Sequence, residues 1–120
     1  MFEYWIDSDL TRLPIVKQLN GNVFSQDSGA NKIGVRVTEN GEPVTLSGTV
    51  KAFIKKPDGE TLDVTGTANG NEAYVVLPSS AYNVVGMLGV YVRIETSDQT
   101  ITLGGIEGRV YPSIIGQTIT

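Results

Sequence analysis

Two residue types are absent from this 120-residue chain, cysteine and histidine. Nucleophilic sites built on a Ser-His or a Cys-His pair are therefore excluded, because such sites need an imidazole base. Ordinary structural zinc sites are excluded as well, because their ligands are cysteine and histidine. The lack of cysteine and of an evident signal segment fits synthesis and folding in a reducing cytoplasm.

Long apolar runs and basic residues are also scarce. No apolar run approaches the length of about 18 residues that a membrane span requires, so we expect no membrane partner. Nine Lys and Arg stand against 13 Asp and Glu, which gives a net charge of −4. Nucleic-acid affinity comes largely from basic side chains that neutralise phosphates, and the only basic cluster, Lys51, Lys55 and Lys56, is followed by Asp58 and Glu60. We therefore expect no nucleic-acid partner.

Short alternating segments separated by turn residues dominate the rest of the chain. Hydrophobic residues make up 40% of the sequence and glycines number 14, which is typical of a globular β domain with frequent turns. The Asn-Gly pair at 40–41 and the Pro-Asp-Gly run at 57–59 favour tight turns. The stretch 78–82 favours one short helical turn, and the Gly-Gly pair at 104–105 predicts a bulge. Alternation of apolar and polar residues predicts strands at 32–38, 49–56, 61–65, 72–77, 87–94 and 100–110.

This pattern predicts an all-β fold, a single immunoglobulin-like antiparallel β-sandwich with an extended N-terminal arm. The sandwich is expected over residues 32–112, with residues 113–120 as a C-terminal tail. Residues 1–31 are too apolar for a solvated tail, and two alternatives stay open for them. They form either an arm that lies along a neighbouring molecule or the first strands of their own sandwich.

Several stretches carry a resemblance to a known family. The segments KKPDGETLDVTG and AYVVLPSSAYNVVGMLGVYVRI resemble the N-terminal domain of the baseplate upper proteins of phages that infect Gram-positive bacteria. The lead-in YWIDSDLTRLPIVKQLNGNVFSQDSGANKIGV and the run TENGEPVTLSGTV are similar to small phage or prophage structural proteins of gut Firmicutes. The resemblance covers about residues 4–112, which is nearly the whole chain.

The resemblance implies a non-enzymatic structural protein of the phage virion. A full baseplate upper protein continues into a long fibre, whereas this chain stops at residue 120, so we expect a module that mounts or decorates. Its place would be the tail baseplate or the capsid, where it would form the base of a head fibre or a decoration. Its partners would be other virion proteins, it would be multi-copy or a homo-oligomer, and the host cytoplasm would be the site of its synthesis.

Apolar side chains outside the predicted core are the candidates for a partner interface, because interface cores favour aromatic and apolar residues. Two aromatic residues fall on the opposite face of their strands from the aliphatic ones, and the other candidates lie near the two ends of the chain. The candidate interface residues are Trp5, Leu13, Ile15, Val16, Leu19, Phe53, Tyr91, Ile114 and Ile115.

The main alternative is a module that binds carbohydrate or a host surface by aromatic stacking. The side chains available to it are Tyr4, Trp5, Tyr74, Tyr82 and Tyr91, which do not cluster in the sequence. This alternative predicts a monomer in which these rings gather into one exposed patch.

The carboxylates suggest no reaction centre. Asp7 and Asp9 are two residues apart, but they lack the glycine and the final glutamate of a calcium-binding loop. Nothing in the sequence brings a second carboxylate to the defined distance that a glycosidase pair requires. We interpret these acids as solvated turn residues and expect neither a catalytic residue, a metal nor a cofactor.

Overall fold

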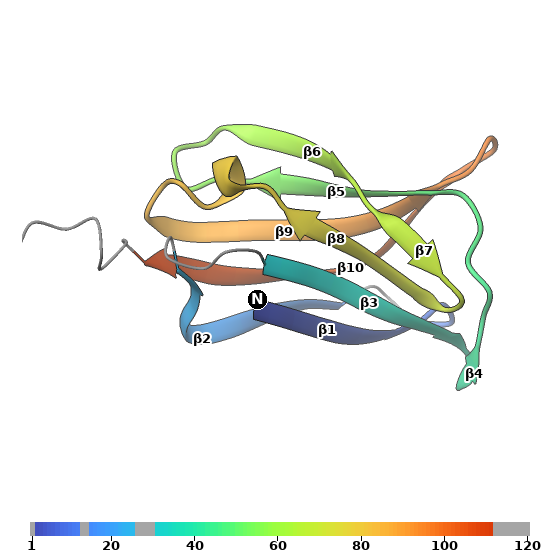
Figure 1. Cartoon of the computed structure of the whole chain (residues 1–120). Coiled ribbons are helices and arrows are strands. Elements are labelled where there is room, and N and C mark those ends of the chain that lie inside the picture. Colours follow the sequence, from blue (N-terminus) through green and yellow to red (C-terminus); the bar gives the residue numbers. More distant parts are fainter. Residues whose placement is uncertain (1, 13–14, 26–30, 112–120) are drawn as a thin grey trace, which may run out of the picture.

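The computed structural model describes residues 2–12, 15–25 and 31–111, which form two β-sheets packed face to face (Figure 1). The all-β sandwich expected from the alternation is confirmed, and the single 3-10 turn η1 lies within the predicted stretch 78–82. No helix in these residues is long and apolar enough to cross a membrane. The elements are β1 (Phe2–Asp9), β2 (Ile15–Ser25), β3 (Asn31–Glu39), β4 (Glu42–Pro43), β5 (Thr49–Lys55), β6 (Thr61–Thr65), β7 (Thr67–Asn69), β8 (Glu72–Leu77), η1 (Ser79–Ala81), β9 (Gly86–Glu95) and β10 (Thr100–Tyr111).

The strand order is that of an immunoglobulin-like Greek key. Sheet A has the order β1-β3-β8-β7, with the short β4 beside the end of β3, and sheet B has the order β2-β10-β9-β5-β6. The run β3-β8-β7 facing β10-β9-β5 corresponds to the two facing sheets of immunoglobulin domains. The chain reaches this arrangement without the cysteine pair of true immunoglobulin domains.

The N-terminal segment supplies one edge strand to each sheet. β1 runs parallel to β3 and β2 runs parallel to β10, whereas every other pair of described strands is antiparallel. The expectation of an extended N-terminal arm is corrected accordingly, because the described part of residues 1–31 pairs with the chain's own sheets. These two parallel pairs are also a departure from the purely antiparallel sandwich that the alternation predicted.

The core lies between the sheets and consists of the side chains that alternation had placed inward. Ile33, Ala52 and Val90 are fully buried, as are most aliphatic residues at alternate positions of β3, β5 and β9. The predicted irregularity of β10 is present as a register shift between Thr102 and Gly104 in its pairing with β9. The buried side chains hold these strands in place and thereby fix the positions of the outward-facing residues.

The sheets are joined on one side by a single-residue crossover. β6 belongs to sheet B and β7 to sheet A, and only Gly66 separates them. The Gly66 N–H donates to the Val50 carbonyl at 2.8 Å. A Cβ at this position would collide with the Tyr74 carbonyl oxygen and approach the Val75 side chain to 2.5 Å. Glycine is therefore required where the chain passes from one layer to the other.

Candidate interaction surfaces

The outer face of sheet B has an aromatic pair at its centre. Phe53 on β5 and Tyr91 on β9 are register partners, and their rings stack with centroids 6.4 Å apart and an interplanar angle of 28°. Both side chains point away from the core, as the alternation predicted, and Phe53 is 37% exposed. The strands thus present a preformed apolar platform to the outside.

Glycines allow the Tyr91 ring to lie close against this sheet. Gly105 is its register partner on β10, and Gly89 precedes it by two residues on β9. A Cβ would come within 2.8 Å of Tyr91 Cδ1 at Gly105 and within 2.6 Å of its Oη at Gly89. The Tyr91 hydroxyl donates to Glu107 at 2.6 Å. Burial, followed by this carboxylate, raises the pKa of Tyr91 to about 12.

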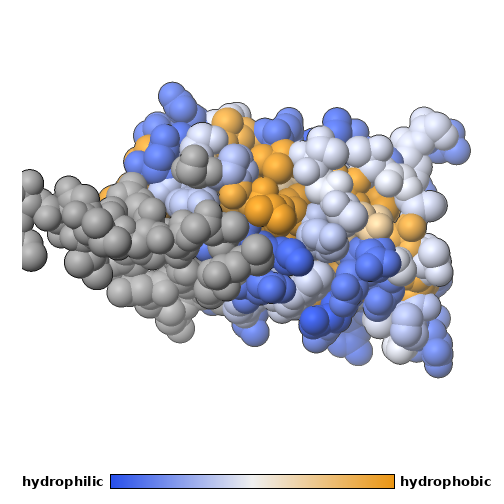
Figure 2. All heavy atoms as spheres, in the orientation of Figure 1, coloured by the Kyte–Doolittle hydropathy of each residue, from blue (hydrophilic) through white to orange (hydrophobic). Residues whose placement is uncertain are grey.

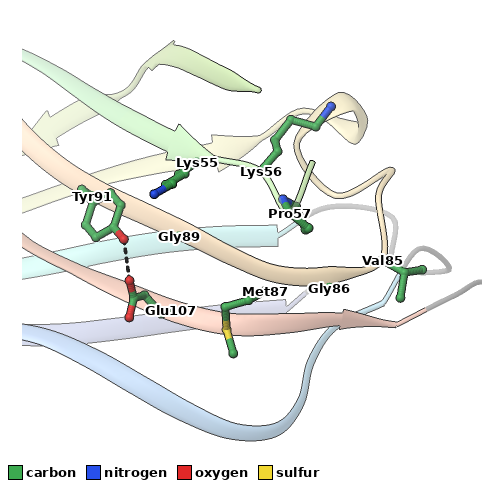
Figure 3. A pocket seen from close by; sticks show the side chains of 9 residues that line it. All are labelled: Lys55, Lys56, Pro57, Val85, Gly86, Met87, Gly89, Tyr91 and Glu107. Carbon is green, nitrogen blue, oxygen red and sulfur yellow. Dashed lines mark hydrogen bonds between the residues drawn. The ribbon is translucent and has the colours of Figure 1, made fainter. Parts of the chain in front are cut away.

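A cleft of about 480 Å³ opens beside this platform, between the β5–β6 turn and the start of β9 (Figure 3). Val85 and Met87 line it, and each is 49% exposed. The end of β5 contributes Lys55 and the turn contributes Pro57, and the Tyr91–Glu107 pair lies on the other side. The cleft therefore combines exposed apolar side chains with a cation and a carboxylate, a lining suited to a side chain of a partner.

Exposed apolar residues concentrate on this side of the molecule. Val16 on β2 is 45% exposed and pairs with Gly105, so it lies on the same outer face as Phe53 and Met87. Sheet A and its loops carry fewer exposed apolar residues. On the face drawn in Figure 2, the apolar surface forms limited groups between polar areas. Among the described residues, the large hydrophobic side chains that are exposed are Leu10, Val16, Phe53, Val76, Val85 and Met87.

The outer face of sheet A carries a second aromatic cluster, again built over a glycine. Trp5 on β1 and Tyr74 on β8 flank Gly34 on β3, and their rings meet edge to face with centroids 6.0 Å apart. The Arg36 guanidinium lies 4.6 Å from the Trp5 ring centre, and Lys32 Nζ lies 4.4 Å from that of Tyr74. Each ring therefore has a cation on its face.

The positions of the five candidate aromatic rings test the alternative of a carbohydrate-binding module. Tyr82 is only 4% exposed, and Tyr4 is half-buried and packs against the core. Trp5 and Tyr74 hold cations over their rings, and Tyr91 is stacked on Phe53. The five candidate rings are distributed over the core and both outer faces, so the structure does not gather them into one patch.

Several candidate interface residues cannot be placed on these surfaces. Leu13, Ile114 and Ile115 lie outside the described residues. Ile15 and Leu19 belong to β2, and only their backbone position is described. The interface role of all of them stays a prediction.

The Asp9 carboxylate is engaged in hydrogen bonds within the chain. Its oxygens accept hydrogen bonds from the backbone N–H groups of Thr11, Asn40 and Gly41 at 2.9–3.2 Å and from the Thr38 hydroxyl at 2.9 Å. The hydroxyl and N–H of Thr11, followed by the Gly41 N–H, hold the pKa of this carboxyl well below its usual value. The carboxylate thus ties the end of β1 to the β3–β4 turn. In the described ranges, no group of three or more acidic side chains could hold a metal ion.

Comparisons with known proteins find a likeness among solved structures. No family model matches the chain, and no curated protein matches it. A solved structure shares its fold. It is the N-terminal domain of ORF48 of phage TP901-1, with a TM-score of 0.53 and 16% sequence identity. The match covers 94% of this chain and 99% of that one, so the likeness extends over nearly the whole length of both.

Proposed function

We propose that this protein is a structural component of a phage virion, a non-enzymatic module that attaches to the tail baseplate or to the capsid. The observation that carries this proposal is the fold, which matches a phage protein domain over 94% of the chain. The sequence resemblance to baseplate upper proteins supports it separately, because it rests on turn and strand motifs of this chain. The baseplate is the favoured location, since the resemblance points there.

Attachment in this proposal uses the faces of a rigid sandwich. The described N-terminal strands are committed to the two sheets, so they are not free to wrap around a neighbour. The outer face of sheet B offers the Phe53–Tyr91 platform and the cleft beside it, and apolar area buried there contributes roughly 25 cal/mol per Å² before ordering costs. Several copies on one particle would add their individual contacts by avidity.

The location is tested on particles produced by the bacterium that carries the gene. An antiserum against the purified chain is applied to intact virions, and gold label is counted by electron microscopy at the tail tip and on the head. Label at the tail tip supports the baseplate role, and label on the head supports the capsid role. The protein's absence from purified particles, despite its presence in the lysate, would overturn the proposal.

The attachment face is tested by two matched surface variants. Phe53→Asp alters the outer face of sheet B and Val76→Asp alters that of sheet A, at side chains that are 37% and 45% exposed. We expect both proteins to fold and only Phe53→Asp to be lost from particles. Equal incorporation of both variants would remove sheet B from the proposal.

A further inference from the structure

The four sheet edges of this sandwich differ in how they are protected. An edge strand presents unpaired N–H and C=O groups, and proteins blunt such edges with short strands, bulges or inward-pointing charges. β7 has three residues and β6 has five. β2 has register shifts in its pairing with β10, and its Lys17 pairs with buried Ile106, which places a charge on the core-facing side. Three of the four edges therefore carry a protective feature.

β1 is neither short nor bulged and has no inward-pointing charge, so its protection is limited to the acids on its outward face. Its eight residues pair with β3 in one unbroken parallel register, from Phe2 opposite Asn31 to Asp9 opposite Thr38. Its core-facing positions include Ile6 and Ser8, which are buried and uncharged. No other described strand pairs with its second edge. Alternate residues of β1 thus direct N–H and C=O groups toward an open edge.

The open edge borders a hollow between the two sheets. β1 and β2 leave a space of about 500 Å³ on this side of the sandwich, opposite the Gly66 crossover. Ile6 lines it from β1 and exposed Lys17 lines it from β2, and Val16, which points to the outer face of sheet B, lies at its rim. A strand added beside β1 would cover this hollow with its core-facing side chains.

The charges on β1 indicate the charge that a partner strand would carry. Glu3 and Asp7 stand on the outward face of β1, on either side of Trp5, and both are exposed. If two copies paired through β1 around a two-fold axis at Trp5, Glu3 of each would face Asp7 of the other, and like charges directly opposite are destabilising. A segment with basic residues on its outward face would instead pair with both acids.

We propose that β1 accepts an extended segment of another protein as an added strand of sheet A, a segment with basic residues outward and apolar residues toward the hollow. The recognition mode is strand addition, in which backbone hydrogen bonds give affinity and alternate side chains give specificity. The argument uses the geometry and charge of β1 and the hollow beside it, so it holds whether or not the chain is a virion component.

The test uses the full chain, labelled with ¹⁵N, and a capped peptide of alternating valine and lysine as the probe. One control peptide has glutamate in place of lysine, and a second keeps the side chains but is N-methylated, which removes its amide hydrogens. We expect the lysine peptide alone to shift the β1 amide signals and to slow their exchange with solvent. Lack of binding, equal binding of the N-methylated peptide, or shifts confined to other strands would overturn the proposal.

Charge-reversal variants add a second readout. Glu3→Lys with Asp7→Lys should weaken the lysine peptide about tenfold through two cross-strand charge pairs and allow the glutamate peptide to bind. Asp58→Lys with Asp98→Lys makes the same change in net charge at exposed positions in turns of sheet B, away from β1. Equal weakening by both double variants would show that net charge alone attracts the peptide and would overturn the proposal. If the β1 variant does not fold, the three peptides on the unaltered chain decide the question.

Discussion

Replacing Gly34 by alanine tests whether the aromatic cluster on sheet A depends on that glycine. A Cβ at Gly34 would lie 2.5 Å from Trp5 Cε3 and 2.8 Å from Cη2, and its three nearest neighbours are all atoms of the indole ring. Gly34 has no positive φ, so alanine fits the backbone. We therefore expect Gly34→Ala to displace the ring while leaving the strand in place.

The expected loss of stability follows from the contacts that the Trp5 ring would lose. The edge-to-face contact of Trp5 with Tyr74 contributes about 0.5–1.5 kcal/mol, and the Arg36 cation over the ring contributes about 0.5–1 kcal/mol. Alanine also restricts the unfolded chain, which stabilises the folded protein by about 0.4–1 kcal/mol. The free energy of unfolding should therefore fall by about 1 kcal/mol. Because Trp5 is the only tryptophan, its fluorescence should shift to longer wavelength as the ring enters water.

A double-mutant cycle isolates the ring as the cause. In a Trp5→Ala background nothing remains for the new Cβ to displace, so Gly34→Ala should now stabilise the protein by about 0.4–1 kcal/mol. Urea unfolding followed by far-ultraviolet circular dichroism measures all four proteins, since two of them lack the fluorophore. Destabilisation by Gly34→Ala in both backgrounds would refute the reasoning. Gly105 supplies a contrast, because its Cβ would meet the Val90 carbonyl oxygen at 2.6 Å, which no ring removal relieves.

Three further substitutions test other parts of the structure. Gly66→Ala should lower the free energy of urea unfolding by about 3 kcal/mol, because its Cβ meets backbone. The folded-state pKa of Asp9 lies below its ordinary 3.8, so its stabilisation is present above that value and lost as pH falls below it. Asp9→Asn should therefore flatten the decline of urea stability between about pH 6 and pH 2. Glu107→Gln should lower the Tyr91 pKa from about 12 toward 10.0, measured by ultraviolet titration against Tyr91→Phe as the reference.

The core strands were predictable from the sequence because burial on one face imposes a local pattern. Alternation in the segment that contains Ile33 and Val35, and in the one that contains Val90 and Val92, identifies both the strand and its inward face. The partners of β1 and β2 were not predictable in the same way. Their parallel pairing joins segments that are distant in sequence, and a local pattern does not say which edge a strand will occupy.

The candidate surfaces were predictable only in part. Phe53 and Tyr91 were identified because they break the apolar alternation of their strands. Gly105 was interpreted only as part of a bulge and Gly34 was not singled out, so the close packing of an aromatic ring against each of them was missed. A glycine at an outward position inside a strand does signal a close approach, but the ring that approaches comes from a neighbouring strand, which the sequence alone does not specify.

The parallel pairing of β2 with β10 has a consequence for how the chain is made. Gln18 on β2 bonds Glu107 on β10, 89 residues later, so β2 emerges from the ribosome long before its partner strand exists. Pairing of such distant segments slows folding, because the loop must close before the contacts form. Sheet B can therefore close only once β10 has been synthesised, and a product that terminates before β10 leaves β2 with an unpaired edge that is prone to aggregation.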